Sequence, residues 1–394
     1  MAGPLTGYRV LDMSRVLAGP WAGQLLADLG ADVIKVERPK VGDDTRHWGP
    51  PYLKDATGAD TEDAAYFFSA NRGKRSLTVD ITQPEGQDII RKLASKVDVL
   101  IENYKVGGLA KYGLDYSSLE KLNPKLVYCS ITGFGQTGPY AQRPGYDFLI
   151  QGMAGLMSVT GEPDNQNGGG PTKVGVAVTD IFTGLYAANA IQGALLERHH
   201  SGMGQYIDLA LLDVQAAVMA NQASNYLIGG QIPGRLGNAH PNIVPYQAFA
   251  TLDSHVIVAV GNDQQFQRFC KAIGEPKWAD DQRYATNTAR VNNRVTLCGQ
   301  ITKHLKQQTS QYWLSKFEDH AVPCGPINTI DQVFDDPQIQ SRNMVLTMQD
   351  PRAGELKLVA NPINYSRSQI EYHLAPPQLG NQTIEILQEY LEYA

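Results

Sequence analysis

The sequence predicts an α/β protein that contains a parallel, doubly wound sheet. Apolar runs with the composition of β-strands alternate with helical patterns in the N-terminal part of the chain, and this alternation is typical of parallel strands joined by crossover helices. The length of 394 residues exceeds what one core usually holds and predicts two or three domains. A hydrophobic content of 42% with 19% charged residues is typical of a folded globular protein.

Buried strands are expected where short runs of Val, Ile and Leu lie between turn signals. In the N-terminal part these runs cover residues 8–13, 32–37, 75–80, 97–103 and 126–135. A helix is expected over residues 19–30, with Pro20 at its start and Gly30 at its end, and another in the segment PEGQDIIRKLASKV. Two long helices over 145–157 and 180–198, a strand in GQYIDLALLD and a helix over 214–227 are expected to follow.

The rest of the chain predicts a second, smaller domain and a return to the first. Residues 1–227 are expected to form the N-terminal part of the large domain. A passage rich in Gly, Pro and Asn predicts a linker over 228–245. The strand HVIVAVG and several charged amphipathic helices then predict a small α+β domain over 246–325. Residues 326–394, with short strands such as GELKLVANPI and a final helix over 384–393, are expected to be a linker and the C-terminal part of the large domain.

Composition argues against several classes of protein. A net charge of −6 argues against a nucleic-acid-binding surface. The four cysteines form no C-x-x-C pair, which is typical of reduced thiols in a cytosolic protein. The N-terminus has neither the apolar block of a signal peptide nor a transit sequence, and no apolar run is long enough to span a membrane. We therefore expect a soluble cytoplasmic protein.

Sequence motifs for common cofactors are missing. The turn after the first strand, VLAGPWAG, is not G-x-G-x-x-G, which argues against NAD or FAD. Walker A, G-x-S-x-G and H-E-x-x-H sequences do not occur, and the histidines lack the spacing of metal ligands. No metal and no prosthetic group are expected.

Basic residues, Asn and Gly instead gather in the loops next to the predicted strands. These loops contain Ser14–Gly19, Arg38 and Arg46, Ser69–Arg75, Asn103–Lys105 and Lys111. Ligands of doubly wound sheets bind beyond the carboxyl ends of the strands. The cluster predicts a phosphate-rich ligand with an adenine, although for each basic residue taken alone a solvated surface is the favoured interpretation.

One carboxylate, Asp180, stands in front of a helical run that is uncharged from residue 181 to residue 196. Asp is a favoured N-cap, because its side-chain oxygen accepts a free N–H of the first helical turn. A carboxylate at a helix N-terminus in apolar surroundings is also a candidate nucleophile. The residues alone favour the cap and leave both interpretations open.

Longer motifs carry a resemblance to a known family over essentially the whole chain. They are YRVLDMSRVLAGPWAGQLLADLGADVIKVERP, ANRGKRSLTVD, VLIENYKVGGLAKYGL, CSITGFGQTGPY, RPGYDFLIQGMAGLMSVTGEP, VGVAVTDIFTGLYAANAI, GNAHPNIVPYQAF, VAVGNDQQF and CGPINTIDQVFDDPQIQSR. With these motifs the chain resembles the family III CoA-transferases, the CaiB/BaiF-like family that includes formyl-CoA transferase, carnitine CoA-transferase and the alpha-methylacyl-CoA racemases. The resemblance implies a Rossmann-like large domain, a small domain and a homodimer of two threaded, ring-shaped subunits. In that dimer the large domain of one subunit and the small domain of the other share the active site.

The resemblance also implies roles for individual residues. Asp180 matches the catalytic aspartate, so cap and nucleophile would be the same residue. Coenzyme A, a substrate and not a prosthetic group, is expected to contact Val16, Leu17, Ala18, Arg38, Ala70, Asn71, Arg72, Gly73, Asn103, Tyr104, Lys105, Lys111, Arg143, Tyr146 and Asp147. Asn238, His240 and Gly261 are expected near the substrate. The chain departs from formyl-CoA transferase at VAVGNDQQF, where that enzyme has a run of glycines, and at Lys111, where it has an arginine.

The implied reaction moves CoA from an acyl-CoA donor to a free carboxylic acid through an aspartyl anhydride and an aspartyl-CoA thioester. Backbone N–H groups at the start of the helix that carries Asp180 are expected to stabilise the oxyanions. Short dicarboxylic acids such as succinate, glutarate or hydroxymethylglutarate are the expected substrates. Two alternatives stay open: an acyl-CoA racemase, which carries a histidine where this chain has Tyr146, and a catalytically silent CoA-binding protein.

Overall fold

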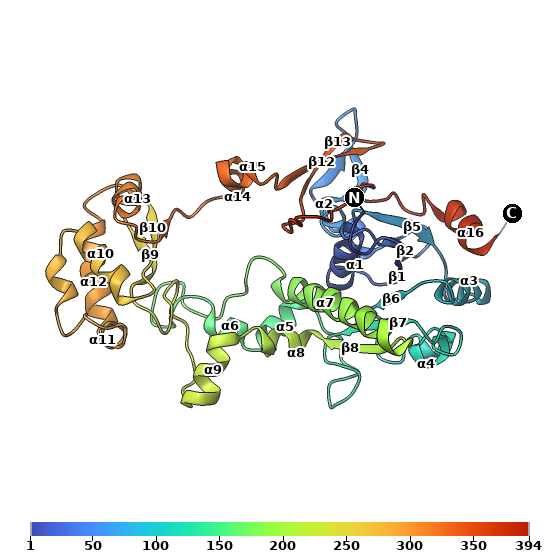
Figure 1. The fold of residues 1–394 in the computed structure, drawn as a ribbon, viewed down its shortest axis with the longest axis horizontal. Helices are drawn as coiled ribbons and strands as arrows, with labels where there is room; N and C mark the ends of the chain where they lie inside the picture. The colour runs from blue at the N-terminus through green and yellow to red at the C-terminus, as the bar shows by residue number, and fades with distance from the viewer. Residues whose placement is uncertain (1, 393–394) are drawn as a thin grey trace. The chain divides into compact units, whose positions relative to one another are not determined.

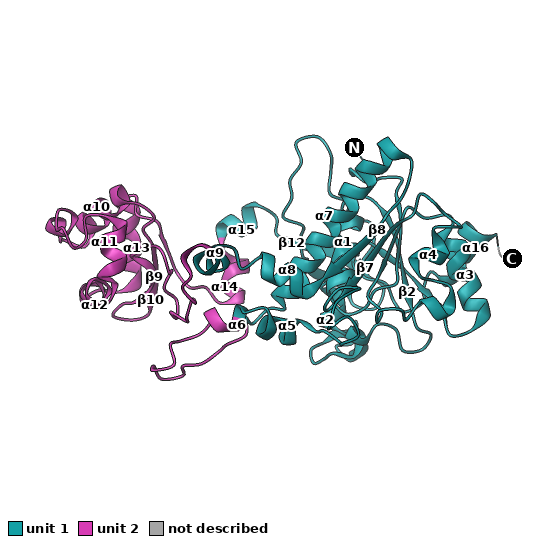
Figure 2. Ribbon diagram, turned by 90° about the horizontal axis from the view of Figure 1, so that it is seen from below, with its two compact units in different colours: residues 1–156, 174–227, 337–394 teal, residues 157–173, 228–336 magenta. Residues whose placement is uncertain are grey.

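The computed structural model describes residues 2–392. The chain divides into two compact units (Figure 2). Unit 1 contains the residues up to 156, residues 174–227 and the residues from 337 onwards, and unit 2 contains residues 157–173 and 228–336. Across the described residues, no helix combines the length and the apolar composition needed to cross a bilayer.

Unit 1 is built on a six-stranded sheet with the order β5-β2-β1-β6-β7-β8 (Figure 1). Its neighbouring strands all pair in parallel. Numbered by their sequence order within this sheet, the strands run 3-2-1-4-5-6, which is the doubly wound order. The predicted parallel α/β fold is therefore confirmed. The strands are β1 (Arg9–Asp12), β2 (Asp32–Glu37), β5 (Lys74–Thr78), β6 (Val99–Glu102), β7 (Val127–Thr132) and β8 (Tyr206–Ala210).

Both faces of the sheet are apolar, because successive side chains of a strand point to opposite sides. Val10 of β1 packs in one core cluster with α1 (Ala18–Asp28) and α7 (Val178–Ser201). Leu11, the next residue, packs in the other cluster with α3 (Pro84–Ala94) and α16 (Thr383–Leu391). The C-terminal helix α16 thus packs in the same core cluster as the first strand, β1.

The helices α1 and α7 pack closely, and this explains why α7 is rich in small residues around Gly184. A Cβ atom at Gly184 would lie 2.7 Å from the backbone oxygen of Ala18. Ala187 and Ala188, one turn further along α7, are buried in the same cluster as Ala18 and Ala22. These small residues of α7 therefore let its N-terminal part, which carries Asp180, pack beside the start of α1.

Several helices differ from the sequence prediction. The expected helix over 145–157 is two helices, α5 (Asp147–Met153) and α6 (Leu156–Val159), separated at Gly155, whose φ of 87° a continuous helix does not allow. The expected helix over 214–227 is also two, α8 (Leu211–Ala217) and α9 (Ala220–Gly229). Tyr393, the expected end of the final helix, lies outside the described residues.

Short elements complete unit 1. These are η1 (Asp44–His47), β3 (Tyr52–Lys54), β4 (Asp60–Ala64), α2 (Ala65–Phe68), η2 (Ala110–Tyr112), α4 (Tyr116–Leu119), α15 (Pro337–Ser341), β12 (Val345–Asp350) and β13 (Gly354–Val359). Two hairpins, β3-β4 and β12-β13, are antiparallel.

Unit 2 has a separate core and a separate sheet. Its three strands have the order β11-β10-β9 and pair antiparallel. Val256 and Val258 of β10 pack with Phe269, Leu297 and Phe317 from the helices. The elements are β9 (Tyr246–Ala250), β10 (His255–Ala259), α10 (Asp263–Ala272), η3 (Pro276–Ala279), α11 (Asn287–Asn292), α12 (Arg294–Leu305), α13 (Ser310–Asp319), β11 (Cys324–Gly325) and α14 (Ile330–Asp335).

Candidate active site

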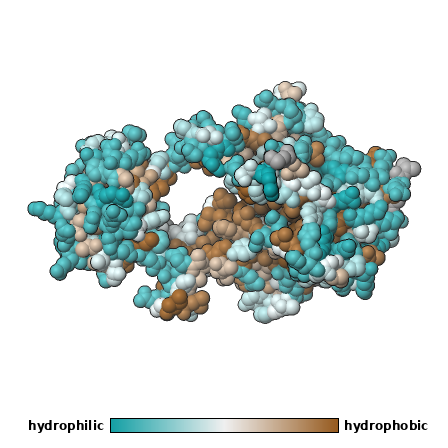
Figure 3. Space-filling view, viewed as in Figure 1, coloured by the Kyte–Doolittle hydropathy of each residue, from teal (hydrophilic) through white to brown (hydrophobic). Residues whose placement is uncertain are grey.

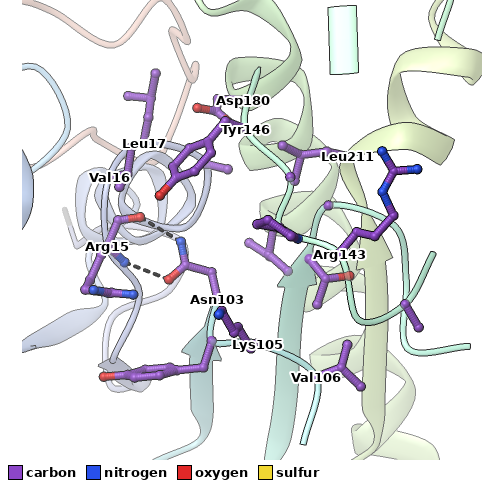
Figure 4. Close-up of a pocket in the computed structure, with 18 of the residues that line it drawn as sticks. Arg15, Val16, Leu17, Asn103, Lys105, Val106, Arg143, Tyr146, Asp180 and Leu211 are labelled. Atoms are coloured by element: carbon purple, nitrogen blue, oxygen red, sulfur yellow. Dashed lines mark hydrogen bonds between the residues drawn. The ribbon is translucent and has the colours of Figure 1, made fainter. Parts of the chain in front are cut away.

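A pocket opens beyond the carboxyl ends of four neighbouring strands of unit 1 (Figure 4). The loops after β1 and β6 meet there at the point where the strand order changes direction, which is the usual ligand site of a doubly wound sheet. The start of α7 contributes Asp180. The lining residues are Arg15, Val16, Leu17, Ala18, Asp44, Asn103, Tyr104, Lys105, Val106, Ile131, Thr132, Gly133, Ala141, Gln142, Arg143, Pro144, Gly145, Tyr146, Asp180 and Leu211.

Asp180 is the third residue of α7 and does not cap it. The N-cap position is held by Ala177, which has no capping side chain. Instead, Oδ1 of Asp147 on α5 accepts the backbone N–H groups of Thr179 at 2.9 Å and Asp180 at 3.4 Å. The interpretation of Asp180 as the helix cap is therefore wrong, because a carboxylate from another helix takes that role.

This arrangement also changes the expected role of the backbone at the start of α7. The N–H groups of Thr179 and Asp180 already donate to Asp147. The N–H of Ile181 donates to the carbonyl of Ala177. These groups are not available to an oxyanion, contrary to the sequence-based expectation.

Asp180 is only 9% exposed, and its carboxyl has no ion-pair or hydrogen-bond partner among the described residues. Burial, and then the charge of Asp147, raise the pKa of Asp180 to about 7. A carboxylate with few donors around it is poorly stabilised in its charged form, and such groups are typical of catalytic sites. Asp180 can therefore be ionised near neutral pH and still be reactive as a nucleophile.

Buried amide side chains hold the first turn of α7 in place. Nε2 of Gln151 donates to Asp147 at 2.7 Å, and its Oε1 accepts the N–H of Val174 at 2.9 Å. The hydroxyl of Thr179 donates to Oε1 of Gln215 on α8 at 2.7 Å. Gln151 and Gln215 are missed by the sequence analysis, although Asp147 and Gln151 have the four-residue spacing of one helix face.

Cationic and aromatic side chains surround the rest of the pocket. The guanidinium of Arg15 lies 5.4 Å from the ring centre of Tyr104, and that of Arg143 lies 4.6 Å from the ring centre of Tyr140. Asp44 accepts from Arg15 at 3.4 Å and from Arg38 at 2.8 Å. Arg38 lines a neighbouring cavity that shares Arg15 and Tyr104 with this one. Guanidinium and ammonium groups beside aromatic rings are suited to phosphates and an adenine.

Two glycines that the sequence analysis does not single out shape one wall. A Cβ atom on Gly133 would lie 2.6 Å from Cα of Gly145, and the reverse contact would be 2.5 Å. Both positions therefore need glycine for the backbones to pass so closely. The contact fixes the loop that presents Tyr146, which is 65% exposed in the pocket. The sequence signal for this contact is the Gly-rich turn after the strand of CSITGFG, which contains Gly133.

The pocket brings together only part of the predicted CoA-binding set. Val16, Leu17, Ala18, Asn103, Tyr104, Lys105, Arg143 and Tyr146 line it with Asp180. Ala70–Gly73 do not line it: Asn71 donates to the carbonyl of Phe67, and Arg72 forms a buried ion pair with Asp28. Lys111 lies over the ring of Tyr112, and the Asp147 carboxylate is engaged with α7. The CoA contacts of these residues stay predictions.

The three residues expected near the substrate lie in unit 2. Asn238 is exposed, and the ring of His240 lies 5.3 Å from that of Tyr246. The N–H of Gly261 donates to the side chain of Gln265. Within residues 2–392, no group of His, Cys, Asp and Glu is arranged to hold a metal ion.

Comparison with known proteins assigns the chain to a family. The model of CoA-transferase family III matches residues 5–383. A succinate–glutarate CoA-transferase from Agrobacterium fabrum is 54% identical over 98% of this chain and 95% of that protein. The human succinyl-CoA:glutarate CoA-transferase is 44% identical over 99% of this chain and 86% of that protein. A CaiB/BaiF family protein from Brucella suis, solved by crystallography, has a TM-score of 0.85 and 49% identity over 99% of this chain and 100% of that one. The chain therefore belongs to the family III CoA-transferases.

Proposed function

We propose that this enzyme transfers CoA from the thioester of one short dicarboxylic acid to a second, free dicarboxylic acid, with succinate and glutarate as the first pair to test. The relatives from Agrobacterium fabrum and human are named for these acids. The observation that carries the proposal is the buried carboxyl of Asp180, which has no partner among the described residues. It lies in a pocket that is also lined by Arg15, Lys105 and Arg143.

The first half of the reaction gives Asp180 the CoA group. A carboxylate oxygen of Asp180 attacks the thioester carbonyl carbon, the C–S bond breaks, and a mixed anhydride and CoA thiolate result. The thiolate then attacks the aspartyl carbonyl, so the donor acid leaves as its carboxylate and an aspartyl-CoA thioester remains. The second acid reverses both steps. Each step conserves an activated acyl group, which is the advantage of covalent catalysis here.

Oxyanions formed in these steps need donors other than the start of α7. The start of α1 is the neighbouring source of N–H groups, because Leu17 and Ala18 line the pocket and no side chain caps that helix. Free N–H groups at a helix start stabilise negative charge. We assign the oxyanion contacts to these backbone groups.

We place the phosphates of CoA against Arg15, Arg38, Lys105 and Arg143, and the adenine beside Tyr104. Arginine forms paired hydrogen bonds with phosphate, and aromatic rings stack on bases. All five residues line the pocket that contains Asp180 or the cavity next to it.

We also propose that the enzyme is a threaded homodimer. An apolar surface supports this: Figure 3 shows brown residues gathered over α5, α7 and α8. Phe148 and Leu149 on α5, and Phe182, Leu185 and Tyr186 on α7, are exposed in the single subunit. Large exposed apolar areas are typical of protein interfaces. Light scattering should give twice the mass of 43.1 kDa, and a fully active monomer would contradict the dimer.

The transfer reaction has a direct test. Succinyl-CoA is incubated with glutarate, and glutaryl-CoA is followed by chromatography, with formate, oxalate and butyrobetaine as other acceptors. The Asp180→Ala variant should bind CoA as the native enzyme does and form no product. Hydroxylamine added with succinyl-CoA should modify Asp180 alone. An active Ala variant, or modification elsewhere, would exclude the covalent mechanism.

A further inference from the structure

The loop between β1 and α1 is held by side chains from other parts of the sheet. The N–H of Ser14 donates to Oδ1 of Asp12 at 3.0 Å, and its carbonyl accepts from Nζ of Lys35 at 3.1 Å. The N–H of Arg15 donates to Oδ1 of Asn103 at 2.9 Å, and its carbonyl accepts from Nδ2 of the same residue at 2.7 Å (Figure 4). Finally, the N–H of Val16 lies 3.3 Å from both carboxylate oxygens of Asp43.

Val16 adopts a backbone conformation that its side chain disfavours. Its φ is 72°, in the left-handed region. For a β-branched residue this conformation is an outlier, because Cβ crowds the backbone. Such strain persists only where the surrounding structure imposes it, and it gathers at binding and catalytic sites. Val16 is also the first residue of the segment that turns from the sheet into the start of α1, where Leu17 and Ala18 line the pocket.

Two of the side chains that hold this loop, Lys35 and Asp43, are charged and fully buried. Nζ of Lys35 lies 2.8 Å from Oδ2 of Asp43, and both side chains have no exposed surface. A second buried pair, Lys74 with Asp12, flanks the loop, since Asp12 accepts the N–H of Ser14 and Nζ of Lys74 donates to the carbonyl of Pro20 in α1. Buried ion pairs add little net stability compared with apolar residues of the same volume. Stability alone is therefore a weak reason for placing Lys35 and Asp43 here.

We propose that Lys35 and Asp43 are positioning residues that keep Val16 in its left-handed conformation, and that they thereby set the affinity of the pocket for CoA thioesters. Lys35 binds the carbonyl of the residue before Arg15, Ser14, and Asp43 binds the N–H of Val16. Asn103 binds the N–H and the carbonyl of Arg15 between them. Without the ion pair, the loop relaxes and only a fraction of molecules presents Val16–Ala18 correctly. Apparent affinity falls by that fraction, while the bound enzyme reacts as before.

The test uses the double variant Lys35→Met with Asp43→Asn. It removes both charges together and leaves neither buried without its partner, so we expect it to fold. The Asn side chain also keeps an acceptor for the backbone of Thr45, which Asp43 binds in the native protein. We expect KM for succinyl-CoA, and Kd for CoA by calorimetry, to rise about tenfold, as a competent fraction of about one tenth requires. We expect kcat at saturation to stay within about twofold, because only ground-state binding changes.

Restoring the backbone conformation by another route gives the decisive comparison. Glycine adopts a φ near that of Val16 without strain, so adding Val16→Gly to the double variant should recover most of the lost affinity. The effects of Val16→Gly and of the double variant on Kd should then be clearly non-additive. An equal loss of affinity with and without the Val16→Gly substitution would overturn the proposal, as would a double variant with native KM and Kd.

A matched control separates positioning from general damage. Asp63 is another buried carboxylate of unit 1, and it pairs with Arg46 at 2.9 Å and with Arg352. These partners lie outside the loop of residues 14–16. Asp63→Asn should lower the unfolding temperature and leave Kd for CoA unchanged. An equal rise of Kd in Asp63→Asn would show a general effect of buried charge and would overturn the proposal.

The inference rests on the proposed function, but the two fail differently. A native enzyme that binds no CoA and transfers none would end the proposed function. An active native enzyme whose double variant binds CoA equally well would end only the role of Lys35 and Asp43.

Discussion

The carboxylate of Asp147 accepts the backbone N–H groups of Thr179 and Asp180, at 2.9 Å and 3.4 Å. It caps the helix that carries Asp180, the nucleophile that we propose, and its charge is also the second cause, after burial, of the raised pKa of Asp180. One side chain therefore fixes the position of Asp180 and weakens its acidity. Both effects can be measured separately.

Transfer should depend on pH near neutrality. Burial and Asp147 raise the pKa of Asp180 to about 7, and only the ionised carboxylate attacks a thioester. We expect kcat/KM to rise with pH and to level off above this value. The profile is measured between about pH 5 and 9 with succinyl-CoA and glutarate. A profile that is flat down to the usual range of an aspartate, about pH 4, would contradict the raised pKa.

Replacing Asp147 by Asn should separate its two effects. The amide oxygen keeps an acceptor for the start of α7, and the negative charge is removed. We expect the apparent pKa of kcat/KM to fall, and to stay above about 4 because burial, the larger cause, is unchanged.

The control is Asp147→Ala, which removes the cap as well. It should destabilise the protein by about 1 kcal/mol, the usual cost of losing a cap, measured by urea unfolding. If Asp147→Asn leaves the pH profile unchanged, the charge of Asp147 has no part in the acidity of Asp180.

The buried carboxyl of Asp180 should reduce the stability of the fold above neutral pH. Because the folded-state pKa of Asp180 lies above its unfolded value, the native state binds more protons between about pH 4 and 7, and stability falls as pH rises through this range. Asp180→Asn removes this loss. At pH 8 the variant should be more stable by at most about 4 kcal/mol, the equivalent of about three pKa units.

Urea unfolding at two pH values checks this expectation. Near pH 4 Asp180 is protonated in the native state, and the two proteins should differ little. A variant that is less stable than the native enzyme at pH 8 would show that the Asp180 carboxylate makes a favourable contact.

Asp44 should weaken CoA binding in the native enzyme. It pairs with both Arg15 and Arg38, the cations that we assign to phosphate. Asp44→Asn raises the positive potential of the site and frees these guanidinium groups. We expect Kd for CoA to fall by at most about fivefold, as exposed pairs contribute up to about 1 kcal/mol, with a steeper dependence on salt.

The control for Asp44 is Asp60→Asn, in an exposed pair with Lys54 elsewhere in unit 1. It changes the net charge equally and should leave Kd unchanged. Weaker binding by Asp44→Asn would show that Asp44 orients the arginines for the ligand.

Tyr146 should not support racemisation. The resemblance implies a histidine at this position in the racemases, and a phenol is a far poorer base than an imidazole at neutral pH. Incubation of the enzyme with a chiral 2-methylacyl-CoA in deuterium oxide should give no exchange at the alpha carbon by mass spectrometry. Rapid exchange without CoA transfer to any acid would make the protein a racemase.

The chain itself determined the strands, the helices next to them and the membership of the family. Val10 and Leu11 already indicate a strand buried on both faces, because the period of an apolar run is a local property of the sequence. The loops after β1 and β6 could also be assigned to one ligand from the sequence, because parallel strands place their carboxyl ends at one edge of the sheet.

Tertiary structure decided which side chains act on Asp180 and on Val16. Asp147 and Thr179 are 32 residues apart, and they meet because α5 and α8 pack against the start of α7. Lys35 and Asp43 reach the loop after β1 because β2 lies beside β1 in the sheet. A sequence lists possible caps and ion pairs, but the partner of a buried polar group depends on how helices and strands cross, and that is set by the packing of the whole core.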